Sequence, residues 1–87
     1  MTDAIRDLVA ESKYGSLKIF VKEKGCPLCD ALKPLIPPIA KVYDVETADG
    51  LAEATFYGIM SVPAIVENGE LKAVGQEAIE YLRNKEF

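Results

Sequence analysis

Histidine and tryptophan are absent from this chain of 87 residues, and cysteine occurs only twice. Without histidine, no acid–base mechanism can use an imidazole, and no imidazole can bind a metal ion. A closed zinc site usually takes four cysteine or histidine ligands, which one copy of the chain cannot supply. We therefore expect no metal site and no bound cofactor, and the two thiols remain as the candidates for chemistry.

Clusters of basic residues and long apolar runs are missing as well. Nucleic-acid binding relies on lysine and arginine to neutralise phosphates, so a formal net charge of −4 without a basic run argues against it. The apolar runs are only a few residues long, which is too short to span a bilayer. The first residues also lack the basic-then-apolar order of a secretory signal. We expect a cytosolic monomer that binds neither nucleic acid nor membrane.

The composition is that of an ordinary globular protein, with 49% apolar and 28% charged residues. A chain of this length can build one modest core, so residues 1–87 are predicted to form a single domain. In the cytosol, two close cysteines are more often catalytic or metal-binding than a structural staple.

Both cysteines lie in one motif, Cys26-Pro27-Leu28-Cys29, directly after an apolar strand-like run. Pro27 suits the first position of a helix, because its missing N–H would have no partner there. Unpaired N–H groups and the helix dipole favour a thiolate at such a helix start. Cys26 is therefore the predicted nucleophile, and Cys29, one turn deeper, the thiol that resolves a mixed disulfide. The alternative is two idle thiols or an inert disulfide, although so short a loop gains little stability from a disulfide.

The rest of the sequence alternates between helical and strand-like patterns. Helices are predicted at residues 3–12, from Pro27 through a kink at Pro34 to Pro37-Pro38, from a cap at Asp49 to a stop at Gly58, and at 76–85. Strands are predicted at 17–22, 39–45, 64–66 and 71–74, with Asn68-Gly69 as a hairpin turn between the last two. This order predicts an α/β fold in which a four-stranded mixed sheet carries helices on both faces.

Several of these segments together resemble the thioredoxin superfamily. They are Gly25 to Cys29 after a strand, Ser61-Val62-Pro63 before another strand, and Asn68-Gly69-Glu70 followed by Val74-Gly75. The chain is most similar to the small thioredoxin/glutaredoxin-like redox proteins of bacteria and archaea, over about residues 16–86. The resemblance implies a thioredoxin-like fold, here with an extra N-terminal helix.

The resemblance also implies a substrate-docking face beside the cysteines. A cis peptide bond at Pro63 would present the backbone of Val62 to an extended substrate segment, whereas sequence alone favours a trans bond. The residues expected to form the face are Pro27, Leu28, Met60, Val62, Pro63 and Gly75. For Leu28 and Met60 the alternative is packing in the core, and for Pro63 it is the start of a strand.

Three positions and one short segment depart from the family pattern. Gly25 stands where thioredoxins usually have tryptophan, and Phe20 where they have a buried carboxylate. Proton transfer to Cys29 must then use water, Glu23 or a solvent path held by the backbone. Leu28 replaces the aromatic residue of glutaredoxins, and Gly75-Gln76-Glu77 matches only part of their glutathione site.

The implied function is a thiol–disulfide oxidoreductase that reduces protein disulfides through a Cys26–Cys29 cycle. Its expected partners are protein disulfide substrates and, as reductant, a flavin-dependent thioredoxin-type reductase, with glutathione as the second choice. Two alternatives remain. One is a non-catalytic binding or redox-sensing module, and the other is a glutathione-dependent glutaredoxin.

Overall fold

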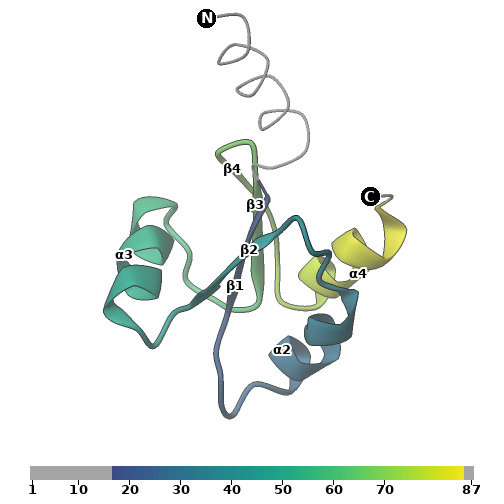
Figure 1. Cartoon of the computed structure of the whole chain (residues 1–87), viewed down its shortest axis with the longest axis horizontal. Coiled ribbons are helices and arrows are strands. Elements are labelled where there is room, and N and C mark those ends of the chain that lie inside the picture. The colour runs from purple at the N-terminus through teal and green to yellow at the C-terminus, as the bar shows by residue number, and fades with distance from the viewer. Residues whose placement is uncertain (1–16, 86–87) are drawn as a thin grey trace, which may run out of the picture.

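The computed structural model describes residues 17–85 (Figure 1). The helix predicted at residues 3–12 lies outside this range. The elements in chain order are β1 (Leu17–Val21), α2 (Pro27–Leu32), the 3₁₀ turn η2 (Lys33–Leu35), β2 (Lys41–Asp44), α3 (Ala48–Phe56), β3 (Ala64–Glu67), β4 (Glu70–Val74) and α4 (Gln76–Asn84). In the described part of the chain, no helix is long and apolar enough to cross a membrane.

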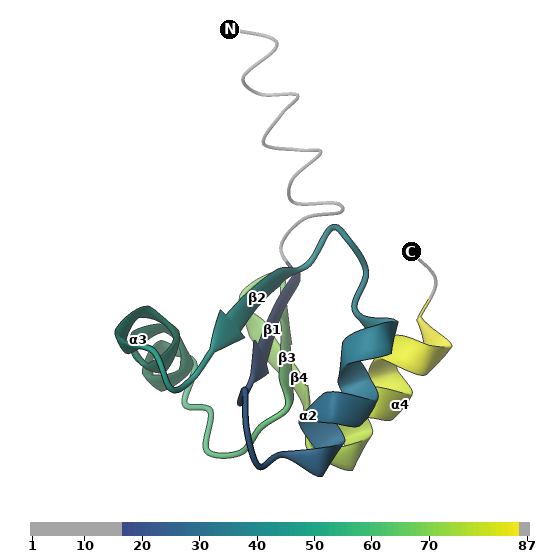
Figure 2. The ribbon, with the colours of Figure 1, turned by 60° about the horizontal axis from the view of Figure 1, so that its bottom comes forward.

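The four strands form one mixed sheet in the order β2-β1-β3-β4. β1 runs parallel to β2 and antiparallel to β3, and β4 returns antiparallel to β3. Helices α2 and α4 cover one face of the sheet, and α3 covers the other (Figure 2). The predicted four-stranded mixed sheet with helices on both faces is therefore confirmed.

Proline and glycine set several of the element boundaries where the sequence predicts them. The α-helix that begins at Pro27 becomes the 3₁₀ turn η2 at Lys33, next to Pro34, because the proline ring cannot continue the α-helical pattern. Asn68 and Gly69 both have positive φ, 54° and 82°, as a two-residue hairpin turn requires. Gly58 follows α3 with φ of 70° and ends that helix.

The predicted cap of α3 at Asp49 is wrong, because Thr47 occupies this position. The Thr47 hydroxyl accepts a hydrogen bond from the Gly50 N–H at 3.0 Å and donates one to the Asp44 carbonyl at 2.7 Å. The second bond ties the cap to the end of β2, which places the helix start two residues earlier than predicted. Asp49 instead lies in the first turn, where its charge still complements the helix dipole.

The sheet separates two clusters of buried apolar side chains. The cluster on the face covered by α2 and α4 includes Leu17, Ile19, Val21, Cys29, Leu32, Ile65, Ala73, Ala78, Ile79 and Leu82. The cluster on the α3 face is built from Phe20, Ala54, Ala64 and Val66. β1 supplies residues to both, as predicted for a strand buried on both sides. Val62 packs against both clusters.

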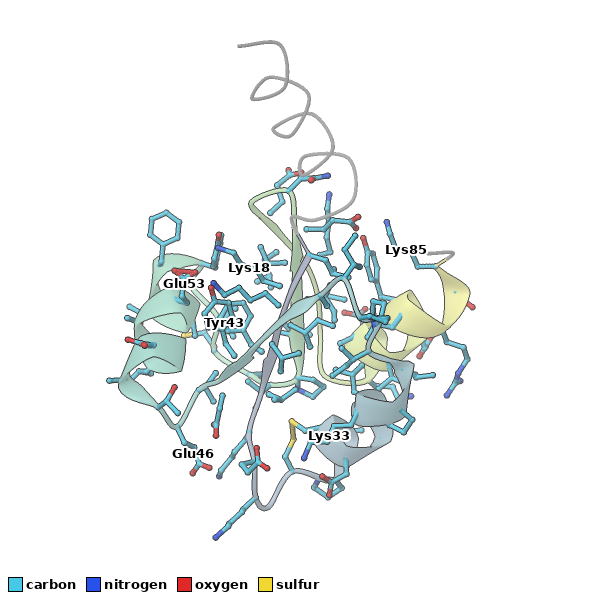
Figure 3. The ribbon with its side chains drawn as sticks, viewed as in Figure 1. Lys18, Lys33, Tyr43, Glu46, Glu53 and Lys85 are labelled. Carbon is cyan, nitrogen blue, oxygen red and sulfur yellow. A yellow bond between two sulfur atoms is a disulfide. The ribbon has the colours of Figure 1, made fainter. Side chains whose placement is uncertain are left out.

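The side chain of Lys18 lies on the α3 face of the sheet, among polar and aromatic partners (Figure 3). Its Nζ lies 3.0 Å from the Glu53 carboxylate and 2.9 Å from the Tyr57 hydroxyl, and it sits over the ring of Tyr43. The hydrogen bonds with Tyr57 and then Glu53 raise the pKa of Lys18. These contacts attach α3 to the sheet next to Phe20.

A second polar cluster joins α4 to the last residue of β3, Glu67. The Glu67 carboxylate accepts a hydrogen bond from the Tyr81 hydroxyl and lies 2.8 Å from Lys85 Nζ. Burial acts to raise the pKa of Glu67, but the hydrogen bonds from Lys85 and Tyr81 outweigh it, so the pKa falls below its ordinary value of 4.5. The ionised form of Glu67 is thus the one that the fold favours.

This cluster predicts a loss of stability in acid. Because the folded pKa of Glu67 is depressed, its contribution is present above the unfolded pKa and disappears as the pH falls through the folded pKa. We expect Glu67→Gln to lower the free energy of unfolding by about 1 kcal/mol near neutral pH and to cost progressively less in acid. Urea unfolding of the wild-type protein and of Glu67→Gln, from neutral pH into acid, measures the difference in the free energy of unfolding. A cost that is the same in acid would show that ionisation of Glu67 contributes nothing.

Candidate active site

The two cysteines form a disulfide at the start of α2, visible as the yellow bond in Figure 3. Cys26 is the cap residue of the helix, Pro27 opens its first turn, and the Cα atoms of Cys26 and Cys29 lie 5.2 Å apart. The prediction that the helix begins at the motif is therefore confirmed. Two thiols in one helical turn can close and open a disulfide without rearranging the chain.

Each sulfur accepts a hydrogen bond from a backbone amide. The N–H of Cys29 points to Cys26 Sγ at 3.1 Å, and the N–H of Lys22 points to Cys29 Sγ at 3.4 Å. The two cysteines differ in exposure, because Cys26 is partly exposed whereas Cys29 is fully buried. Cys26 thus lies at the surface of the cluster, and Cys29 is enclosed in it.

The loop before β3 brings three predicted site residues together. The peptide bond between Val62 and Pro63 is cis, as the resemblance implies. The carbonyl of Pro63 accepts a hydrogen bond of 2.7 Å from the N–H of Gly75. Val62 packs against the cluster that contains Cys29, and Cys26 packs against the same cluster. Pro63 itself is buried.

Comparison with known protein families agrees with this geometry. A model of the thioredoxin domain matches residues 16–83, most of the chain. The chain belongs to the thioredoxin domain family. None of the curated proteins with which it was compared matches it. The mixed sheet and its helices are a thioredoxin-like fold, and the C-x-x-C pair at disulfide distance fits a redox protein of this family.

This thioredoxin domain has a phenylalanine where the sequence comparison expects an acid. Phe20 is completely buried in the cluster on the α3 face, stacked on Tyr43 with ring centroids 5.0 Å apart and edge-on to Tyr57. Among residues 17–85, no charged or polar side chain is buried. Cys29 therefore has no buried carboxylate beside it in the described structure.

The charges around this domain's motif lie at its surface. Lys22 is partly exposed, and Glu23 and Lys24 are exposed in the loop that leads to Cys26. Asp30, which would oppose a thiolate, pairs with Lys33 at 3.4 Å on the outer side of α2. Exposed charges are screened by salt, so the backbone amides are the closer and less screened influence on the sulfurs.

Leu28 and Met60 are exposed rather than packed in the core, with 37% and 94% of their surface accessible. The alternative of core packing for these two residues is thereby excluded. Pro27 is exposed as well. Pro27 and Leu28 of α2 and Met60 of the loop before Pro63 therefore present apolar side chains to solvent.

The structure also reveals an apolar groove that the sequence did not indicate. It has a volume of about 210 Å³ and is lined by Val45, Leu51, Ala54, Ile59, Met60, Ser61 and Val62. The groove depends on the distance between α3 and the loop at 59–62, which local patterns do not encode. Within residues 17–85, no group of three or more potential metal ligands comes together.

Proposed function

We propose that this thioredoxin-family protein is a thiol–disulfide oxidoreductase that reduces protein disulfides through a Cys26–Cys29 dithiol/disulfide cycle. The observation that carries the proposal is the disulfide at the start of α2, with a partly exposed Cys26 and a buried Cys29. The amide of Cys29 donates to Cys26 Sγ at 3.1 Å, which favours negative charge on that sulfur in the reduced protein.

The cycle transfers two electrons. The Cys26 thiolate attacks one sulfur of a substrate disulfide, so that a mixed disulfide forms and the first substrate thiolate leaves. Cys29, after losing its proton to water, attacks Cys26 Sγ. The mixed disulfide breaks, the second substrate thiolate leaves, and the Cys26–Cys29 disulfide forms. The substrate is reduced, the protein is oxidised, and the released thiolates take up protons from water.

The substrate would bind as an extended segment beside the cis peptide bond. Val62, which packs against the same cluster as Cys26, would offer its backbone, while the exposed side chains of Pro27, Leu28 and Met60 would offer apolar contacts. Met60 has a flexible, polarisable side chain that adapts to partners of varied shape. Gly75, joined to Pro63 by a hydrogen bond, would border the same segment.

We further propose that the reductant is a flavin-dependent thioredoxin-type reductase in the cytosol, with glutathione as the alternative. Supplying oxidised protein with NADPH and such a reductase should regenerate free thiols, which a thiol reagent can count. If glutathione with glutathione reductase regenerates them faster, the glutaredoxin alternative applies instead.

The reduction of insulin by dithiothreitol tests the activity. We expect the protein to accelerate the precipitation of reduced insulin at catalytic concentration, because a reactive thiolate at Cys26 exchanges faster than dithiothreitol does. The matched control is a double variant, Cys26→Ser with Cys29→Ser, which should give the rate of dithiothreitol by itself. If the wild-type protein is no faster than this control, the domain is a binding or redox-sensing module rather than a reductase.

A further inference from the structure

Cys29 occupies a site that opposes negative charge. Its side chain is completely buried in a cluster of apolar side chains from β1, α2 and α4, among them Val21, Leu32 and Ile79. The charged groups of the neighbourhood lie further out, on the side chains of Lys22, Glu23, Lys24, Asp30 and Lys33. Burial disfavours a thiolate, yet Cys29 must carry the charge whenever the disulfide opens at Cys26.

One polar group reaches the buried sulfur, and the sheet holds it rigidly. The N–H of Lys22 lies 3.4 Å from Cys29 Sγ. This N–H belongs to the same planar peptide group as the carbonyl of Val21, and the two point in opposite directions. The Val21 carbonyl accepts a hydrogen bond of 2.9 Å from the N–H of Val45, just after β2. Because the carbonyl is anchored on one side, the N–H is fixed toward the sulfur on the other.

We propose that the backbone N–H of Lys22 stabilises the developing thiolate of Cys29, while the proton of this thiol is exchanged with water. The proposal rests on the proposed disulfide cycle and identifies the group that stabilises the charge on its buried cysteine, Cys29. When an external thiolate attacks Cys26 Sγ, a new disulfide forms with that thiol and the Cys26–Cys29 bond breaks. Its electron pair passes to Cys29 Sγ, where the N–H already points, and the sulfur later takes a proton from water.

The hydrogen bond strengthens during this step. A neutral disulfide sulfur accepts an N–H weakly, whereas a thiolate accepts it as a charge-assisted bond. A donor that is already oriented where charge develops lowers the barrier without the cost of reorganisation. By microscopic reversibility, the same N–H stabilises the Cys29 thiolate before it attacks a mixed disulfide at Cys26.

Replacing the Lys22 amide by an ester tests the proposal, because an ester removes the N–H and keeps the side chain. The chain suits the synthesis: a peptide thioester of residues 1–25 can be ligated to residues 26–87 at the natural Gly25–Cys26 junction. We expect a small thiol such as 2-mercaptoethanol to open the Cys26–Cys29 disulfide of the ester protein more slowly, by about tenfold or more, as expected for losing a hydrogen bond to a charged acceptor.

Two controls separate this effect from a general disturbance. An all-amide protein made by the same ligation gives the reference rate, and thermal unfolding of the oxidised proteins reports whether the ester is tolerated. In the reduced ester protein, alkylation of Cys26 should be unchanged, because its sulfur takes its hydrogen bond from Cys29 rather than from Lys22. A folded ester protein whose disulfide opens at the reference rate would overturn the proposal.

A measurement on the ordinary polypeptide covers the case in which the ester protein does not fold. In the Cys26→Ser variant, a pH titration ionises Cys29, and the absorbance of the thiolate reports this ionisation. We expect the ¹H NMR signal of the Lys22 amide to move downfield over the same pH range. If the chemical shift of the Lys22 amide proton does not change when Cys29 ionises, the proposal is overturned. Neither experiment uses a protein substrate. A failure to reduce insulin, with these results positive, would therefore count against the proposed function and not against the role of Lys22.

Discussion

Cys29→Ser should accumulate stable covalent complexes with its protein substrates. In this variant Cys26 can still attack a substrate disulfide, since this residue is partly exposed at the start of α2. The mixed disulfide then persists, because the serine hydroxyl cannot attack Cys26 Sγ as a thiolate does. Non-reducing electrophoresis of the variant after incubation with a disulfide-containing protein should show bands of higher mass that disappear with dithiothreitol.

The matched control for this experiment is Cys26→Ser, which keeps one thiol at the same motif. Its remaining thiol, Cys29, is fully buried, so substrate disulfides should not reach it and no covalent complex should form. The wild-type protein should show only a trace of covalent complex, because Cys29 breaks the mixed disulfide quickly when both thiols are present. Equal trapping by the two single variants would contradict the assignment of Cys26 as nucleophile, and trapping by Cys26→Ser alone would reverse the roles.

Phe20→Ala should lower the free energy of unfolding by about 3–5 kcal/mol, the range for removing a buried aromatic side chain. The ring of Phe20 is completely buried between Ala64 and Val66 of the sheet and the rings of Tyr43 and Tyr57. Its loss leaves a cavity under α3 that these neighbours cannot close. Urea unfolding of the oxidised protein, followed by circular dichroism, gives the difference in free energy.

Phe56→Ala is the matched control for this change, since it removes the same atoms from the same face of the molecule. Phe56 is 79% exposed at the end of α3, where its ring rests only edge-on against Tyr57. Its replacement should change the free energy of unfolding by less than about 1 kcal/mol. If the two variants lost equal stability, burial of Phe20 would not be the reason for an aromatic residue at that position.

Much of this fold is predictable from local features of the sequence. Pro27 marks the start of α2, Asn68-Gly69 marks the hairpin, and Gly58 marks the end of α3, because each residue type restricts or permits particular backbone angles. The alternation in 17–22 predicts a strand buried on both sides, which β1 is. The cis bond before Pro63 was predictable only through the resemblance, since the residues around a proline favour the trans form.

Features that depend on distant parts of the chain could not be predicted in this way. Thr47 and Asp49 are both good helix caps, and the choice between them is made by the contact of Thr47 with the end of β2. The groove beside Met60 exists because α3 and the loop before Pro63 lie at a particular distance. The contact of the Lys22 amide with Cys29 likewise requires the geometry of a peptide group anchored across the sheet.

The division of the interior into two clusters, with Val62 touching both, affects how such a protein can diverge. Substitutions beneath α3 act on stability without touching the cluster that holds Cys29, whereas substitutions between α2 and α4 act both on stability and on the surroundings of the sulfurs. Changes of stability made beneath α3 are therefore separable from changes in the midpoint potential of the disulfide. Laboratory evolution could select for stability in a library of substitutions beneath α3 and for the potential in a library between α2 and α4, and then combine the selected variants.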